Sequence, residues 1–227
     1  NRPTESVVTI EDPVERRITG VNQIQVDPRI DFTFVKALRG VLRQDPDVMM
    51  IGEIRDPETA HIGVRAGLTG VTVLSTLHAS DSLAAVDVFH EFGVPPTFIV
   101  DAIKCVVAQR LIRVICKSCR EEYAVDQVAR EALNLTEQEA AAATLARGKG
   151  CDACFQTGYF GRTGVFEVLR LFPELRSAVL KQNSKDELRK IVNDSGLMTL
   201  DQAGRAKVLR GETTVEELLR LQTAFAI

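Results

Sequence analysis

Short apolar runs alternate with amphipathic segments along the first half of the chain. Three runs have the length of a buried strand, and the segments between them repeat apolar residues every three or four positions, as a helix does. The predicted strands are residues 7–10, 48–51 and 71–76, and the predicted helices are residues 33–43, 56–67 and 82–92. Runs that are apolar on both faces and alternate with helices are typical of a parallel sheet, so we predict an α/β fold.

The pattern changes close to residue 116. Residues 116–160 hold four cysteines and many glycines, and they contain few runs typical of buried strands. Helical spacing then dominates, with predicted helices at residues 175–180, 184–193, 200–209 and 214–221, and Ser184 with Glu187 matches a capping box. We therefore predict three parts: an α/β core over residues 1–112, a cysteine-bearing subdomain over 113–165 and a helical region over 166–227.

The composition argues against two classes of protein. Lys and Arg number 28 against 31 Asp and Glu, so the net charge is -3 and the basic excess expected of a nucleic-acid-binding protein is absent. No stretch has the ~18 uninterrupted apolar residues of a membrane span, since polar and charged residues interrupt the best candidate, residues 98–115. No signal segment follows Asn1 and a strand-like run begins almost at once, so we expect the sequence to be part of a longer protein.

Four of the five cysteines form two C-x-x-C pairs, Cys116 with Cys119 and Cys151 with Cys154. With no sign of secretion, this pattern indicates metal or redox chemistry rather than a disulfide framework. Two tight turns that each present two thiolates are typical of a tetrahedral Zn²⁺ site, and four protein ligands leave no position open for catalysis. We predict a structural zinc site, with redox disulfides or an iron–sulfur cluster as alternatives. The fifth cysteine, Cys105, stands among apolar residues and is predicted to lie in the core.

Acidic or histidine residues follow each predicted strand. Glu11 and Asp12 follow the first strand, Glu53 the second and His78 the third. Ligands of parallel α/β sheets bind beyond the carboxyl ends of the strands, so these four side chains are expected to converge. Carboxylates at such an edge can hold Mg²⁺ or orient a water molecule for phosphoryl transfer. The alternative is that each acid only caps the helix that follows it.

These residues lie in three segments: TIEDPVE at 9–15, LRQDPDVMMIGEIRD at 42–56 and LSTLH at 74–78. The segments resemble, in the same order, the Asp box, the Walker B motif and the His box of the type II secretion and type IV pilus assembly ATPases. The resemblance continues through AQRL at 108–111, both cysteine pairs and GYFGRTG at 158–164, and so covers nearly the whole chain. It implies a RecA-like P-loop ATPase core with a mostly parallel sheet, a tetracysteine zinc subdomain and a C-terminal helical region.

The resemblance implies a role for each residue at the strand ends. Glu53 matches the Walker B glutamate that polarises the attacking water, and His78 matches the residue that senses the γ-phosphate. Gly52 stands where many P-loop ATPases have an aspartate linked to Mg²⁺, so Glu11 and Asp12 are expected to position the metal or the water. For His78 the alternative is a half-buried histidine with a structural hydrogen bond.

Four arginines are further candidates. Arg39, Arg43 and Arg55 match arginines that this family places near the nucleotide, in the same or in the neighbouring subunit. Such a side chain can stabilise charge in the transition state. Arg162, in a glycine-rich segment, is a candidate for an intersubunit contact. For Arg39 and Arg43, four residues apart, a solvated helix face is the alternative.

For the whole protein, the resemblance implies a cytoplasmic homo-hexamer that hydrolyses ATP with Mg²⁺ and drives pilin or pseudopilin assembly and protein export. It would dock on inner-membrane platform proteins, without a membrane span of its own and without binding nucleic acid. Two alternatives differ in class. One is a non-catalytic zinc-bearing scaffold of the same machinery, and the other is a motor that translocates DNA, which the acidic net charge disfavours.

The sequence departs from the family pattern at three places. It has no G-x-x-x-x-G-K-[ST] phosphate-binding loop, because Gly148-Lys149-Gly150 follows no apolar strand and lacks the Ser or Thr. In the family this loop comes shortly before the Asp box, so we expect that this polypeptide does not bind ATP tightly. Val71 and Val88 stand where relatives commonly have His and Arg, which puts one intersubunit arginine in doubt and favours the scaffold alternative.

Overall fold

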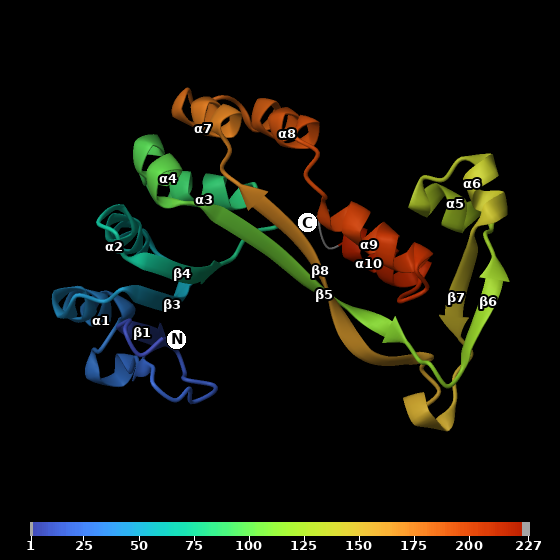
Figure 1. Cartoon of the computed structure of the whole chain (residues 1–227), viewed down its shortest axis with the longest axis horizontal. Coiled ribbons are helices and arrows are strands. Elements are labelled where there is room, and N and C mark those ends of the chain that lie inside the picture. The colour runs from blue at the N-terminus through green and yellow to red at the C-terminus, as the bar shows by residue number, and fades with distance from the viewer. Residues whose placement is uncertain (1, 224–227) are drawn as a thin grey trace. The chain divides into compact units, whose positions relative to one another are not determined.

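Two compact units make up the chain, and each is built from two segments (Figure 1). The computed structural model describes residues 2–223. The first unit, called the sheet unit below, combines Asn1–Val106 with Leu169–Ser195, and the second, the cysteine unit, combines Val107–Val168 with Gly196–Ile227. The three consecutive parts predicted from the sequence stay a prediction, and residues 224–227 of the last part lie outside the described residues.

The sheet unit contains a four-stranded parallel sheet with the strand order β2-β1-β3-β4. Its strands are β1 (Val7–Glu11), β2 (Asn22–Gln25), β3 (Val48–Ile54) and β4 (Thr72–Leu77). Its helices are α1 (Phe34–Val41), α2 (Pro57–Leu68), α3 (Ala84–Glu91), α4 (Pro96–Ala102), α7 (Pro173–Leu180) and α8 (Lys185–Asp194), with short 3-10 turns at Pro28–Ile30 and Leu42–Gln44. The predicted parallel α/β fold is confirmed.

The two central strands, β1 and β3, carry the core of the sheet. Val8, Ile10, Met49 and Ile51 are at most 1% exposed, and α1 and α2 pack against these strands. Truncating such a buried side chain to alanine lowers the free energy of unfolding by about 2–5 kcal/mol. Strand β4 pairs only with β3 in the described part of the chain, and Leu74 on it is 56% exposed. The expectation of a run buried on both faces is therefore wrong for β4.

Side-chain caps set the starts of α1 and α2. Thr33 accepts a hydrogen bond from the N–H of Lys36, and Asp56 accepts one of 2.8 Å from the N–H of Thr59. Each cap satisfies a backbone donor that would otherwise lack a partner, which stabilises the helix by about 1 kcal/mol. The cap at Asp56 also limits the connection between β3 and α2 to a short turn that carries Arg55.

Helices α7 and α8 come from the second half of the sequence and belong to the sheet unit. Their predicted positions are confirmed, and so is the capping box of Ser184 and Glu187. Arg189 of α8 binds Asp81 at 2.9 Å, across 108 positions of the chain. This ion pair fastens α8 to the segment that follows His78.

The cysteine unit holds most of two long strands that pair with each other, β5 (Cys105–Ile115) and β8 (Tyr159–Arg170). An antiparallel pair, β6 (Arg120–Ala124) with β7 (Thr144–Gly148), accompanies them. The helices are α5 (Gln127–Leu133), α6 (Glu137–Ala142), α9 (Leu200–Leu209) and α10 (Val215–Thr223), with a 3-10 turn at Asp152–Cys154. Apolar side chains of β5, β7, β8, α5, α9 and α10 form one core. In the described part of both units, no helix is long and apolar enough to span a membrane.

The helices α9 and α10 match the prediction, but the strands β5 to β8 are missed by it. In β5 the core-facing residues Ala108 and Ile112 alternate with outward residues that are apolar as well, such as Val107. The two-residue alternation that marks a strand is therefore hidden. The prediction that Cys105 lies in the core is wrong: its thiol is exposed, because it stands on the same outward face of β5 as Val107.

Candidate active site and metal centre

Glu53 lies near the carboxyl end of β3, inside an irregular stretch of the strand. The register with β4 shifts between Ile51 and Ile54, and Thr76 donates a hydrogen bond of 2.7 Å to the carbonyl oxygen of Gly52 in this interval. Bulges of this kind redirect side chains and are common beside active sites. The side chain of Glu53 is 18% exposed, so its carboxylate reaches solvent at the edge of the sheet.

Two basic side chains approach this carboxylate from neighbouring segments. Nε of Arg55 lies 2.5 Å from Oε2 of Glu53, and Nε2 of His78 lies 3.8 Å from the same oxygen. The side chains of Arg55 and His78 are 67% and 86% exposed, so both can move away from Glu53 with little loss of burial. The structure thus brings together three of the predicted site residues.

The end of β1 lies directly beside Glu53. Ile10 pairs with Ile51 in the sheet register. A side chain on Gly52 would lie 3.1 Å from the carbonyl oxygen of Ile10 and 3.4 Å from Cα of Glu11. The two backbones therefore come too close at this point to admit a side chain without movement of β1, which is a physical reason for glycine before Glu53.

Glu11 ends β1 with its carboxylate held through one oxygen. Oε1 accepts a hydrogen bond of 2.5 Å from the hydroxyl of Thr9 and one of 3.0 Å from the side-chain amide of Gln23. Asp12 follows outside the strand and is exposed. Sequence reasoning missed both residues: Thr9 lies two positions before Glu11 on β1, and Gln23 comes next to Glu11 only through the pairing of β2 with β1.

The other three predicted arginines are exposed. Arg39 in α1 forms an ion pair of 2.5 Å with Glu58 at the start of α2. Arg43 lies in the short turn after α1, and Arg162 lies in β8 of the cysteine unit. Exposure suits contacts with a nucleotide or a neighbouring subunit, and it also suits a solvated helix face. Both interpretations of Arg39 and Arg43 stay open.

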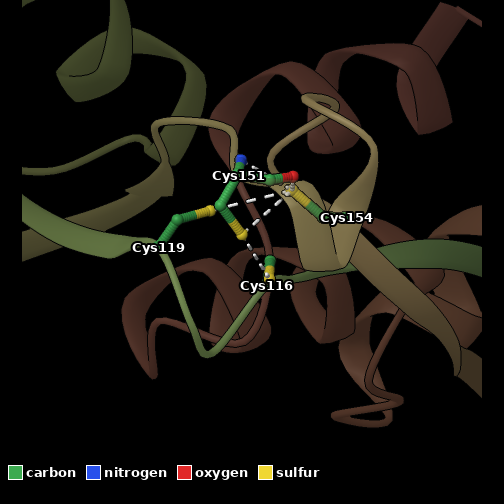
Figure 2. A group of neighbouring side chains, drawn as sticks. All are labelled: Cys116, Cys119, Cys151 and Cys154. Atoms are coloured by element: carbon green, nitrogen blue, oxygen red, sulfur yellow. Dashed lines mark hydrogen bonds between the residues drawn. The ribbon is translucent and has the colours of Figure 1, made fainter.

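The four paired cysteines form a compact cluster, and Figure 2 shows that they come from two loops. All four sulfur atoms lie within 4.8 Å of one another, with separations of 3.9 Å for Cys116–Cys151, 3.8 Å for Cys119–Cys154 and 3.7 Å for Cys151–Cys154. For a Zn–S bond of about 2.3 Å, the edge of a regular sulfur tetrahedron is about 3.8 Å. A disulfide would need about 2.05 Å, and all four thiols are free. The donor set therefore fits one tetrahedral metal ion.

Two glycines allow the cysteine loops to approach each other. The N–H of Cys116 donates a hydrogen bond of 2.9 Å to the carbonyl oxygen of Gly158, and a side chain on Gly148 would meet that oxygen at 2.1 Å. Gly158 has a φ of +76°, which glycine adopts without a steric penalty. Lys149, next to Gly148, pairs with Glu121 at 2.8 Å. The Gly-Lys-Gly segment thus belongs to the cysteine cluster.

Backbone donors stabilise one thiolate of the cluster. The N–H groups of Cys151 and Gly158 each lie 3.3 Å from Sγ of Cys154. Burial acts to raise the pKa of the Cys154 thiol, but these donors outweigh it and lower that pKa to about 6. Burial raises the pKa of Cys119 to about 12. These backbone donors therefore favour the thiolate form of Cys154, which is the form that binds a metal.

The comparison with known proteins follows the same motifs. Residues 1–220 match the family described as "Type II/IV secretion system protein". The chain belongs to this family. It is 44% identical to the Type II secretion system protein E of Pseudomonas aeruginosa over 97% of its own length, and 44% identical to the Type IV pilus assembly ATPase PilB of Thermus thermophilus over 96%. It spans 43% and 24% of the length of these two relatives.

Solved structures show the same fold. The chain matches the pilus retraction motor PilT with bound ADP at a TM-score of 0.67 and 22% identity, over 95% of this chain and 52% of that one. It matches the Legionella pneumophila ATPase DotB at a TM-score of 0.63 and 19% identity, over 96% and 52%. The predicted family and fold class are confirmed. The roles of individual residues in this Type II/IV secretion family chain stay predictions.

Proposed function

We propose that this chain carries the water-activating residues of an ATP-hydrolysing motor for type II secretion or type IV pilus assembly. The observation that carries the proposal is the cluster of Glu53, Arg55 and His78 at the carboxyl ends of two neighbouring parallel strands. Ligands of parallel α/β sheets bind at this edge. The relatives named a type II secretion protein E and a pilus assembly ATPase support the same activity.

In the proposed reaction Glu53 orients the attacking water and accepts its proton. The ion pair with Arg55 holds the carboxylate at rest, and the exposed guanidinium is free to turn toward phosphate charge. His78 donates a hydrogen bond to the terminal phosphate. Glu11 and Asp12 offer carboxylate oxygens to Mg²⁺, which when bound neutralises charge on the phosphoryl oxygens.

The cysteine cluster is proposed to hold one Zn²⁺ with a structural role. The sulfur separations support this assignment, and four thiolates would leave no open position for a reacting water. The alternatives are redox disulfides and an iron–sulfur cluster held by the same four cysteines.

For the whole protein we propose a cytoplasmic homo-hexamer that docks on inner-membrane platform proteins and drives pilin or pseudopilin assembly. Arg39, Arg43 and Arg162 would contact the nucleotide or the neighbouring subunit, and their exposure supports this placement. We also infer that the 227-residue polypeptide binds ATP weakly, since the amides and lysine of a phosphate loop supply most of the grip on a triphosphate. Calorimetric titration with Mg-ATP tests this inference, and sub-micromolar binding would contradict it.

The main experiment measures ATP hydrolysis by the longest natural form of the protein, as wild type and as Glu53→Gln. We expect the rate to fall by about 100- to 10,000-fold, the contribution of a positioned general base. Glu137→Gln is the matched control: the side chain of Glu137 is 89% exposed and is expected to tolerate the same chemical change. A Glu53→Gln variant as fast as an active wild type would overturn the proposed role of Glu53.

The second candidate function is a non-catalytic zinc-bearing scaffold of the same machinery. Val71 and Val88, at positions where relatives commonly have His and Arg, favour this candidate. It predicts that wild type and Glu53→Gln hydrolyse ATP at equal rates near zero.

A further inference from the structure

The side chain of Gln23 makes three hydrogen bonds, one each to a carboxylate oxygen, a backbone carbonyl oxygen and a backbone N–H group. Its Nε2 donates to Oε1 of Glu11 at 3.0 Å and to the carbonyl oxygen of Arg16 at 3.0 Å. Its Oε1 accepts from the N–H of Ile18 at 2.6 Å. An amide has two N–H protons and one carbonyl oxygen, and each is used. The opposite amide orientation would place a carbonyl oxygen against the carboxylate of Glu11, so this network allows one orientation only.

These bonds leave the two oxygens of Glu11 in different situations. Oε1 accepts hydrogen bonds from the side-chain amide of Gln23 and from the hydroxyl of Thr9. Within residues 2–223, Oε2 has no hydrogen-bond partner. The carboxylate is thus fixed through one oxygen and presents the other at the end of β1.

The same amide also holds the segment that follows Asp12. Arg16 and Ile18 lie four and six positions after Asp12, and Gln23 binds the main chain of both. Strand β2 pairs in parallel with β1, with Gln23 opposite Thr9, so this contact follows from the sheet register.

We propose that Gln23 is a positioning residue for the acidic pair Glu11 and Asp12. It orients Glu11 through the carboxylate and Asp12 through the main chain that follows. This inference rests on the proposed function, in which the two acids position Mg²⁺ or the attacking water. Groups that orient ligands of a metal typically contribute 10- to 100-fold to activity or metal affinity.

Gln25 is a natural control, two residues further along β2. Its Oε1 accepts a hydrogen bond of 3.1 Å from the N–H of Val14, and among the residues that the structure describes its side chain donates no bond to a carboxylate. Gln25→Glu therefore keeps the acceptor that Gln25 uses. Gln23→Glu has the same size, but it loses both donors and places a second carboxylate beside Glu11.

The first test is ATP hydrolysis by the longest natural form of the protein. We expect Gln23→Glu to lower kcat by about 10- to 100-fold with little change in KM for ATP, and Gln25→Glu to stay within about twofold of wild type. A double-mutant cycle tests whether Gln23 acts through Glu11. In the Glu11→Gln variant, a glutamate at position 23 can again form a hydrogen bond with the side chain at position 11. Adding Gln23→Glu to that variant should therefore lower kcat by less than about a further twofold. Full additivity would show that Gln23 does not act through Glu11.

The second test needs no nucleotide. Hydrogen exchange is measured on the 227-residue chain, and Gln23→Leu should speed exchange at the amide of Ile18 while Gln25→Leu speeds it at Val14. Unchanged exchange at Ile18 would show that Gln23 does not hold the main chain that follows Asp12. If Glu53→Gln is as active as wild type, or if wild type does not hydrolyse ATP, the proposed function fails and this inference fails with it. If Glu53→Gln is inactive and Gln23→Glu is fully active, the inference alone is overturned.

Discussion

The cysteine cluster joins two short loops whose cysteines are three residues apart, whereas the strand-end cluster of Glu53, Arg55 and His78 collects residues from the ends of two neighbouring strands. Four identical donors with separations of 3.7–3.9 Å fit one kind of occupant, a tetrahedral metal ion. The strand-end cluster has three different side chains, a carboxylate, a guanidinium and an imidazole, and the last two are mostly exposed. The first site is therefore defined by its own geometry, whereas the second depends on two exposed side chains that can move.

Removing a ligand from the cysteine cluster is expected to have the largest effect. Structural zinc contributes about 10–16 kcal/mol of binding free energy in small zinc domains, so Cys154→Ser should lose metal and part of the fold. Elemental analysis should find about one zinc per chain in wild type and a small fraction of that in the variant. Hydrogen exchange should rise over residues 116–158.

Cys105→Ser is the control for this experiment, because Cys105 is an exposed thiol outside the cluster. It should retain zinc and the wild-type melting temperature. A metal-free wild type that keeps the melting temperature of the zinc-loaded protein would contradict the structural role of the site.

Measuring zinc content in a variant of the strand-end cluster tests whether the two sites are independent. Glu53→Gln should reduce hydrolysis by about 100- to 10,000-fold and leave the zinc content unchanged. Its free energy of unfolding should change by less than about 1 kcal/mol, because Arg55 is 67% exposed and exposed ion pairs add little. Loss of zinc in Glu53→Gln would show that the variant disturbs the fold and not only the site.

The cysteine site was predictable because its information is local. The spacing of Cys116, Cys119, Cys151 and Cys154 is enough to specify four thiolates on two turns. What the spacing did not reveal is how the loops meet, since the hydrogen bond from Cys116 to Gly158 and the close approach of Gly148 and Gly158 depend on the fold.

The strand-end site was predictable only in part. Long apolar runs located β1 and β3, and therefore Glu11 and Glu53. Strand β2, with the sequence NQIQ, is too short and polar to stand out, so the contact between Gln23 and Glu11 could not be anticipated. Backbone pairing with β1 forms this strand, and such pairing leaves little trace in a hydrophobic pattern.

The two units also differ in their ion pairs, and the pair of Arg113 with the buried Glu217 in the cysteine unit gives the third prediction. Glu217 is 5% exposed and accepts hydrogen bonds of 2.7–2.9 Å from the backbone and guanidinium of Arg113. Burial acts to raise the pKa of Glu217, but Arg113 outweighs it and holds that pKa below its usual range. The stabilisation is therefore complete above the unfolded-state pKa of about 4.3 and is lost as the pH falls through the folded-state value.

Glu217→Gln should lower the free energy of unfolding by about 1–3 kcal/mol at pH 7, because it weakens the charge-assisted hydrogen bonds to Arg113, whose side chain is 41% exposed. The difference between variant and wild type should shrink as the pH falls below about 4.3. Thermal unfolding at several pH values measures both. Glu216→Gln, at the exposed neighbouring position, is the control, and an equal loss of stability in both variants would contradict the role of the buried pair.

The exposed pair of the sheet unit gives the smallest expected effect. Arg39 and Glu58 are 61% and 55% exposed, so Arg39→Gln should change the free energy of unfolding by less than about 1 kcal/mol. Because stability is nearly unaffected, any large change in ATP hydrolysis would report a contact outside this ion pair. Loss of hydrolysis with unchanged melting temperature would assign Arg39 to the nucleotide or to a neighbouring subunit, whereas unchanged hydrolysis would leave it on a solvated helix face. Because this pair is weak, Arg39→Gln separates a role of Arg39 in hydrolysis from its contribution to stability.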